Sequence, residues 1–219
     1  TGVDFEVSGD LAGSNGRPEV AMAANGDFVV TWEVERGGDC GVAYRLYGVD
    51  GTAKTDVRMV PNFGDERHPD VAMNDGGSFV IAYTRVLEAP VNDGGTRDNG
   101  AVIAQLFDSR GTPAGSEVVV SDRYYLANQD YARTAMADTG EFVVVWAESE
   151  LNGDSFSYLN NYTIACQAFD ASGEPRFDED IEVSPYNSTF TTRKAWRPDV
   201  AINPTTGDFV VTWDEEHLY

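Results

Sequence analysis

Basic residues, histidine and cysteine are scarce in this sequence, and the shortage of positive charge excludes several partners. The 15 lysines and arginines face 37 aspartates and glutamates, which gives a net charge of −22. A surface this acidic repels nucleic acid and anionic membranes, because binding to phosphate groups depends on lysine and arginine contacts. We therefore expect no nucleic-acid partner. The charge favours solubility, cations and basic partners instead.

Long apolar runs are also absent. No stretch approaches the roughly 18 apolar residues of a membrane-spanning helix, so we expect no membrane insertion. The chain begins with Thr1 and carries no signal-peptide pattern, and we interpret it as a processed form or a fragment. Its two cysteines, Cys40 and Cys166, form no metal-type cluster. Hydrophobic residues at 42% and aromatic residues at 11% are nevertheless enough for a folded core.

One sequence motif occurs four times along the chain. Its copies read RPEVAMAANGDFVVTW, HPDVAMNDGGSFVIAY, YARTAMADTGEFVVVW and RPDVAINPTTGDFVVTW, at residues 17–32, 68–83, 131–146 and 197–213. The glycine and the final aromatic residue keep the same offsets in the first three copies, and the fourth has one inserted turn residue. A second phrase, with a glycine in a tight turn, follows each of the first three copies. Offsets this regular identify an internal repeat.

Each complete repeat predicts four antiparallel strands. In the first repeat these strands cover residues 20–22, 28–32, 42–47 and 57–60, and we call them A to D. Glycine supplies the positive φ angle that the tight turns between them require. Strand B is apolar almost throughout and rich in valine and aromatic residues, so both of its faces should be buried. Strand A carries a small residue suited to the narrow centre of a ring, at Ala21, Ala72, Ala135 and Ala201.

These features predict an all-β propeller built of four-stranded antiparallel blades, because a four-stranded sheet buried on both faces is typical of a blade between neighbours. The expected divisions are an isolated strand D at 1–8, blades at 17–60, 68–121 and 131–184, and a partial fourth blade at 197–219. A β-solenoid or a row of sandwiches is the alternative. Solenoid coils are shorter, however, at about 20 to 30 residues, and lack the two tight hairpins.

The two ends of the sequence predict a split, incomplete blade. Residues 4–8 (DFEVS) match residues 180–184 (DIEVS) at the end of the third repeat. The chain therefore begins with a strand D and ends with strands A and B, which together would give only three strands. We expect the chain to be part of a larger ring or array, or to be completed by another chain, because open blades expose sheet edges.

The pattern P-x-V-A-x-x-x-x-G-x-F-V-V-x-W, followed by x-A-Q-x-F-D-x-x-G, resembles a tandem repeat of large secreted bacterial surface proteins of the haemolysin and cyanobacterial adhesin type. The residues that carry the resemblance are Pro18, Val20, Ala21, Gly26, Phe28, Val29, Val30 and Trp32, with Ala104, Gln105, Phe107, Asp108 and Gly111. The resemblance covers nearly the whole chain and implies a secreted or cell-surface location. It departs at Ala132, which replaces the proline, and at Gly48, which replaces the hairpin aspartate.

The loops that differ between the copies are the expected place for a ligand, because a rigid ring commonly presents its binding loops on one face. The B–C loops and the loops from D to the next A share one rim, at residues 33–41, 84–100, 147–162, 9–17, 61–68, 122–131 and 185–197. Aromatic side chains there can stack on sugar rings or anchor a protein partner, or can fill their own loops. The candidate ligand-binding residues are Tyr124, Tyr125, Tyr131, Tyr158, Tyr186 and Trp196.

Acidic residues on the same rim are candidate calcium ligands, and calcium is the only cofactor that the sequence suggests. The metal candidates are Asp93, Asp98 and Asp154, with Glu148 and Glu150 on the same rim. Ca²⁺ takes six to eight oxygen ligands, but no D-x-[DN]-x-[DN]-G loop is present, and isolated acids are usually solvated. Two glycan-acceptor sequons also fall on this rim, at Asn161 and Asn187.

Arginine recurs at or beside the start of strand A. The four residues are Arg17, Arg67, Arg133 and Arg197, and His68 stands where the first and last copies have arginine. Four arginines around a channel can hold an anion. They can also pair with nearby acids and so fix the loops, and this second interpretation is the favoured one.

Common catalytic motifs are missing. The sequence has no G-x-S-x-G elbow, no H-E-x-x-H and no phosphate-binding loop. A glycosidase needs two carboxylates about 5 to 10 Å apart, and 37 acids leave that open. We therefore predict an extracellular or cell-surface module for recognition or adhesion that binds a glycan or a protein. The alternatives are a structural subunit of an extracellular filament or sheath, built from further copies of itself, and a propeller glycoside hydrolase.

Overall fold

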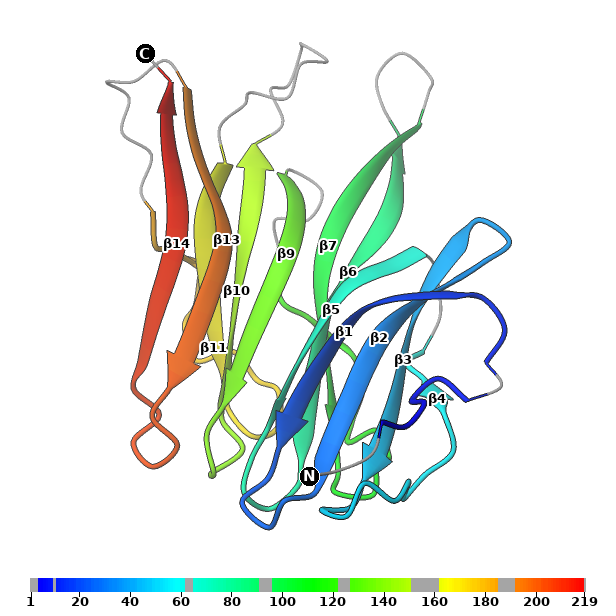
Figure 1. Cartoon of the computed structure of the whole chain (residues 1–219). Coiled ribbons are helices and arrows are strands. Elements are labelled where there is room, and N and C mark those ends of the chain that lie inside the picture. Colours follow the sequence, from blue (N-terminus) through cyan, green and yellow to red (C-terminus); the bar gives the residue numbers. More distant parts are fainter. Residues whose placement is uncertain are drawn as a thin grey trace.

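The computed structural model describes residues 4–9, 11–61, 65–90, 96–121, 127–150, 162–184 and 192–218. All regular secondary structure in these ranges is β, and the strands form antiparallel sheets that radiate from a common centre (Figure 1). The fold is therefore an all-β propeller, as the repeat predicts. None of the described residues belongs to a helix long and apolar enough to cross a membrane.

Three complete blades follow one another along the chain, each hydrogen-bonded in sequence order. The first consists of β1 (Ser14–Met22), β2 (Phe28–Arg36), β3 (Asp39–Tyr47) and β4 (Arg58–Met59). The second consists of β5 (Asp65–Met73), β6 (Phe79–Pro90), β7 (Thr96–Phe107) and β8 (Val118–Val119). The third consists of β9 (Ala127–Met136), β10 (Phe142–Glu150), β11 (Tyr162–Phe169) and β12 (Ile181–Glu182). The last two strands are β13 (Thr192–Ile202) and β14 (Phe209–Leu218).

The first strand of each blade lies at the centre, so β1 contacts β5, β5 contacts β9, and β9 contacts β13 (Figure 1). The sheets do not close into a ring, and the first blade and the partial fourth blade lie at the two ends of the row. The partial fourth blade is joined to the third sheet by one parallel pair, Tyr162 with Lys194. We refer to β1, β5, β9 and β13 as the inner strands.

Apolar slabs between the blades form the core. The slab between the first and second blades contains Val29, Tyr44 and Ile81, and the slab between the second and third contains Val102 and Trp146. Strand B is buried on both faces in the second and third blades, as the sequence predicts. In β14 the prediction is wrong, because Val210 and Thr212 are exposed. A stacked aromatic pair closes the lower end of each complete blade, with ring centroids 4.7 to 5.0 Å apart, at Phe28–Tyr47, Phe79–Phe107 and Phe142–Phe169.

The hairpins on the upper rim are longer than the sequence indicates. β1 begins at Ser14 and β2 continues to Arg36, so much of the expected 33–41 loop is a paired hairpin. Likewise β6 and β7 stay paired as far as Pro90 and Thr96, inside the expected 84–100 loop. These extensions contain charged residues, such as Glu33, Glu35, Arg85 and Glu88, so the almost wholly apolar pattern that identifies the lower part of strand B ends there.

Residues 4–8 form no strand, although the sequence predicts an isolated strand D there. They lie against the outward face of the first blade, where the ring of Phe5 is 5.3 Å from that of Tyr47. The carbonyl oxygen of Val7 accepts hydrogen bonds from Arg45 Nη1 at 3.4 Å and from the Tyr47 hydroxyl at 3.3 Å. Val7 also packs in a cluster with Trp32. This segment therefore covers a blade face that has no neighbouring blade.

Candidate functional site

Each inner strand contains a bulge at the same step. In β1 the pairing register with β2 shifts between Gly16 and Glu19. The register shifts at the corresponding points of β5, β9 and β13. Within each bulge one residue has a left-handed backbone, with φ between 48° and 55°, and these four bulge residues are Arg17, His68, Tyr131 and Arg197. Every other described residue with positive φ is a glycine. Proline follows three of the four, and because it has no N–H group it fits a position where the ladder is interrupted.

A pocket of about 250 Å³ opens beside the bulge of the second blade. We call it the inner-rim pocket, and its walls are Asp65, Arg67, His68, Thr84, Val86, Gly100 and Asp130. These residues come from β5, β6 and β7 of one blade and from β9 of the next. The volume is slightly below the roughly 300 to 1,000 Å³ of pockets for drug-sized ligands, so the space suits one small polar ring.

His68 is held from several sides. Its backbone N–H donates to Glu33 Oε1 at 2.5 Å. Its ring stacks on Tyr131 with a centroid distance of 4.9 Å and an interplanar angle of 13°. Its Nδ1 makes a short contact with Asp130 Oδ1, and its side chain is only 13% exposed. An imidazole fixed at Nδ1 by a carboxylate can exchange a proton through Nε2.

Asp130 is fixed as firmly as the histidine it contacts. Its Oδ1 accepts hydrogen bonds from the Thr84 hydroxyl at 3.1 Å and from the Tyr131 backbone N–H at 2.8 Å. Carboxylates and donors from β5, β6 and β9 therefore converge on one side of the inner-rim pocket. Such an arrangement orients the histidine, because the carboxylate decides which ring nitrogen carries the proton.

Asp65 is an ionised carboxylate in the wall of the same pocket. Burial opposes ionisation, but hydrogen bonds from the Arg67 guanidinium and the Cys40 amide outweigh it, and the pKa of Asp65 lies below its ordinary value. Arg67 Nη2 lies 2.5 Å from Asp65 Oδ2, and the Cys40 N–H lies 3.1 Å from Oδ1. The pocket thus combines a fixed negative charge with an oriented imidazole.

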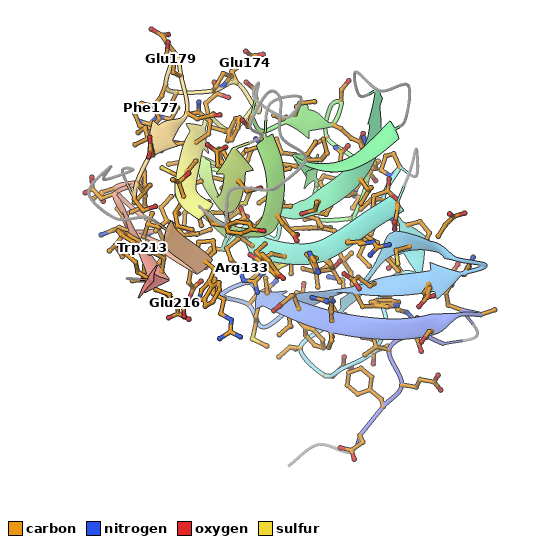
Figure 2. The ribbon with its side chains drawn as sticks, turned by 90° about the horizontal axis from the view of Figure 1, so that it is seen from above. Arg133, Glu174, Phe177, Glu179, Trp213 and Glu216 are labelled. Atoms are coloured by element: carbon orange, nitrogen blue, oxygen red, sulfur yellow. The ribbon has the colours of Figure 1, made fainter. Side chains whose placement is uncertain are left out.

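Asp70 follows the same bulge and titrates in the opposite direction. Burial raises its pKa to about 6, the charge of Glu19 adds to the effect, and Thr134 and Arg133 oppose it. Its Oδ2 accepts a hydrogen bond from the Thr134 N–H at 2.7 Å. Figure 2 places Arg133 near the centre of the molecule, between the first and last inner strands. Two carboxyl groups of β5 thus have pKa values shifted apart, which is typical of functional sites.

The arginines near the bulges pair with acids, as the favoured interpretation of the sequence predicts. Arg17 Nε lies 3.3 Å from Glu33, and Arg67 Nη2 lies 2.5 Å from Asp65. Two further pairs are longer: Arg133 lies 4.0 Å from Glu19, and Arg197 lies 3.8 Å from Asp214. Each of the four guanidinium groups therefore has a carboxylate within 4.0 Å.

The structure describes only some of the residues selected from the sequence. Tyr131 and Trp196 lie on the adjacent inner strands β9 and β13, and they are 43% and 36% exposed. Asp98 lies in β7 opposite Glu88. The remaining candidates lie outside the described residues, and they are Tyr124, Tyr125, Tyr158, Tyr186, Asp93, Asp154, Asn161 and Asn187.

Calcium stays a prediction. Within the part of the chain that the structure describes, no group of three or more His, Cys, Asp or Glu residues lies close enough to hold a metal ion. Glu148, counted among the acids of the loop rim, is instead buried and accepts a hydrogen bond from Trp146 Nε1 at 3.2 Å. Both cysteines are free thiols.

Sequence reasoning missed the carboxylates of the inner-rim pocket. Asp65 and Asp130 lie one to three residues before the bulge residue of their strand, in segments expected to be loops. The signal that could have found them is His68, which replaces arginine at a repeated position. The first and last copies carry arginine at this step, so His68 and Tyr131 mark the second and third blades as chemically different.

No family model and no curated protein matches this sequence, but solved structures do. An endo-arabinase from Bacteroides thetaiotaomicron is 11% identical with a TM-score of 0.52, over 92% of this chain and 74% of that one. An α-L-arabinanase from Penicillium chrysogenum, complexed with arabinobiose, is 12% identical with a TM-score of 0.52, over 91% and 52%. The hemagglutinin-neuraminidase ectodomain of parainfluenza virus 5 is 7% identical with a TM-score of 0.52, over 92% and 56%.

These similarities define the class of the protein by its fold alone. The chain is an open β-propeller and spans between about half and three quarters of the length of these three structures. The resemblance to the repeats of secreted surface proteins stays a prediction, and so does the secreted or cell-surface location.

Proposed function

We propose that this chain is a carbohydrate-active propeller domain that hydrolyses a glycosidic bond at the inner-rim pocket. The observation that carries the proposal is the meeting of a fixed Asp130–His68 pair and an ionised Asp65 in the walls of one small cavity. Two similar folds belong to an endo-arabinase and an arabinanase, which supports a glycan as the ligand. This reading replaces adhesion as the leading hypothesis.

The residues divide the chemistry between them. Glycoside hydrolysis needs a proton donor for the leaving oxygen and a carboxylate on the other side of the sugar, about 5 to 10 Å away. His68, as the imidazolium, gives its Nε2 proton to the leaving oxygen, and Asp130 stabilises that cation through Nδ1–H. A water molecule then attacks the anomeric carbon, and the proton it releases returns to His68. Asp65 remains negative and stabilises the positive charge that develops on the sugar ring.

The decisive experiment is turnover of a panel of nitrophenyl glycosides and polysaccharides, with arabinan included. Wild-type protein should cleave at least one of them. Asp130→Asn and Asp65→Asn should each lose about 10²- to 10⁴-fold in kcat, while the melting temperature and glycan binding are retained. Asp199→Asn is the matched control, because Asp199 is an exposed inner-strand carboxylate outside the pocket.

A recognition module that binds without cleavage is the second candidate, because Tyr131 and Trp196 are exposed on adjacent inner strands. If wild-type protein binds a glycan but cleaves none of the panel, the hydrolase is wrong and the recognition module stands. A filament or sheath subunit requires ordered polymers of the purified chain, which electron microscopy would reveal.

A further inference from the structure

The four bulge residues hold a backbone conformation that is unfavourable for residues other than glycine. A left-handed backbone is strained for an ordinary residue because its Cβ crowds the neighbouring carbonyl group, whereas glycine adopts it freely. The chain uses glycine at every other positive-φ position described, yet at one repeated step it has Arg17, His68, Tyr131 and Arg197. A bulge needed only for architecture would be served by glycine, so the side chains themselves must have a use.

Tyr131 has the geometry of a sugar platform. One face of its ring is covered by His68, at 4.9 Å and 13°, yet the residue remains 43% exposed. Its exposed surface therefore belongs to the face and edge that point away from His68, next to the inner-rim pocket but outside its walls. An aromatic ring that is rigid on one side and open on the other can stack on the apolar face of a sugar.

Arg17 and Arg197 are paired with carboxylates but can still donate hydrogen bonds to a ligand. Arg17 is paired with Glu33 at 3.3 Å, and Arg197 with Asp214 at 3.8 Å. Their side chains are 57% and 80% exposed, so N–H groups remain available on each guanidinium. A guanidinium has five N–H donors, and one carboxylate uses at most two of them in a fork.

The surrounding charge excludes anionic ligands. Asp65 and Asp130 line the pocket, Glu33 contacts its histidine, and the chain carries a net charge of −22. A polyanionic glycan approaching this rim meets an unfavourable field, because the paired arginines add no net positive charge. Neutral hydroxyl groups meet no such barrier and find both donors and acceptors.

We propose that the bulge residues are the specificity-determining set for a neutral oligosaccharide, with one sugar ring stacked on Tyr131 and hydroxyl groups bound by Arg17 and Arg197. The inference rests on the proposed function for the position of the site, but it concerns binding rather than bond cleavage. The ligand is thus a chain of uncharged sugars that follows the bulges of the inner strands, with Tyr131 on β9 between Arg17 on β1 and Arg197 on β13.

Glycine substitution tests this directly, because it removes the side chain and relieves the backbone together. Tyr131→Gly should lower the affinity for short neutral oligosaccharides by at least tenfold, and Arg197→Gly by about threefold, measured by calorimetry. Both variants should keep or exceed the wild-type melting temperature, since glycine is the preferred residue at positive φ. Tyr131→Phe keeps the stacking ring and should keep the affinity.

The control is Phe177→Ala, because Phe177 is an exposed aromatic at the outer edge of the third blade (Figure 2). It should change neither affinity nor specificity. Binding of uronic-acid and sulfated oligosaccharides of matched length should be at least tenfold weaker than that of the neutral ones.

Three results would overturn the inference. Wild-type protein that binds none of the neutral oligosaccharides has no such subsite. Tighter binding of the uronic-acid or sulfated set contradicts the ligand class. If Tyr131→Gly leaves the affinity for neutral oligosaccharides unchanged and lowers the melting temperature, the ring of Tyr131 has a structural role instead. By contrast, binding of neutral sugars without turnover defeats the hydrolase and leaves this inference intact.

Discussion

The third blade and the partial fourth contain nearly the same B strand and bury it very differently. FVVVW at residues 142–146 is buried throughout, whereas FVVTW at residues 209–213 alternates between partly buried and exposed positions. Val143 has no exposed surface, and its counterpart Val210 is 61% exposed. The difference lies in the neighbours, because β10 has a blade on each side and β14 has one. In a repeat protein, burial belongs to the interface between units and not to the sequence of one unit.

The first blade is intermediate between these two. It also lacks a neighbour on one side, but residues 4–8 and Leu11 cover part of that face. Trp32 and Val34 are therefore buried, while Val20 and Met22 on β1 remain exposed. A short covering segment thus replaces part of a blade.

The largest effect on stability is expected from an aspartate at Val143, compared with the same substitution at its counterpart Val210. Val143→Asp buries an unpaired carboxylate and should lower the free energy of unfolding by at least about 4 kcal/mol. Val210→Asp faces solvent and should change it by no more than about 0.5 kcal/mol. Chemical denaturation measures both. If Val143→Asp does not fold, Val143→Thr provides the measurable cost, and equal losses at the two sites would contradict the comparison.

A smaller effect should follow from weakening the cover of the first blade. Val7→Asp places a charge in the cluster that contains Trp32, and we expect a loss of about 2 kcal/mol. The measurement is urea unfolding followed by tryptophan fluorescence. Val119→Asp serves as the control, because Val119 is 51% exposed on an outer strand. A loss no larger than the control's would mean that residues 4–8 do not stabilise the blade.

The smallest effect concerns pH. The pKa of Asp70 is raised to about 6, above the ordinary value of about 3.9, so the folded state holds the proton more tightly. Its stabilising contribution is complete below about pH 4 and is lost as the pH rises through 6, a fall of about 1 kcal/mol after allowance for partial exposure. Asp70→Asn should remove that fall.

Asp199→Asn is the matched control for this titration, since Asp199 occupies the same step of β13 but is exposed. Melting temperatures between pH 4 and pH 7 decide the outcome. A slope that survives Asp70→Asn would assign the titration to another group.

Much of the fold could be predicted because the repeat encodes its own packing. The motif that ends at Trp32, Tyr83 and Trp146 predicts strand B and the number of complete blades, and both are confirmed. Its burial on both faces is confirmed in the second and third blades and is wrong for β14. The upper hairpins could not be predicted, because the almost wholly apolar pattern of strand B ends where their charged residues begin. The bulges also escaped prediction, since large side chains such as Tyr131 disfavour the conformation that they adopt there.

The site was harder to predict than the fold for a physical reason. Its carboxylates, Asp65 and Asp130, come from different blades and meet only because the inner strands lie side by side. In a chain with 37 acidic residues, no spacing in the sequence separates these two from the others. His68 was visible as an exception within the repeat, but its partner was not.

The apolar slabs between the blades also determine the order in which this protein unfolds. Each blade is stabilised by its own strands and by coupling to adjacent units, so the protein behaves as a short one-dimensional array. The unit at the open end, β13 and β14, has a single coupling and should fray first, with its amide hydrogens exchanging long before those of β10. By the same logic, a duplicated repeat added beyond β14 would convert Val210 from a solvent-facing residue into an interior one. Growth by gene duplication therefore requires no redesign of the units already present.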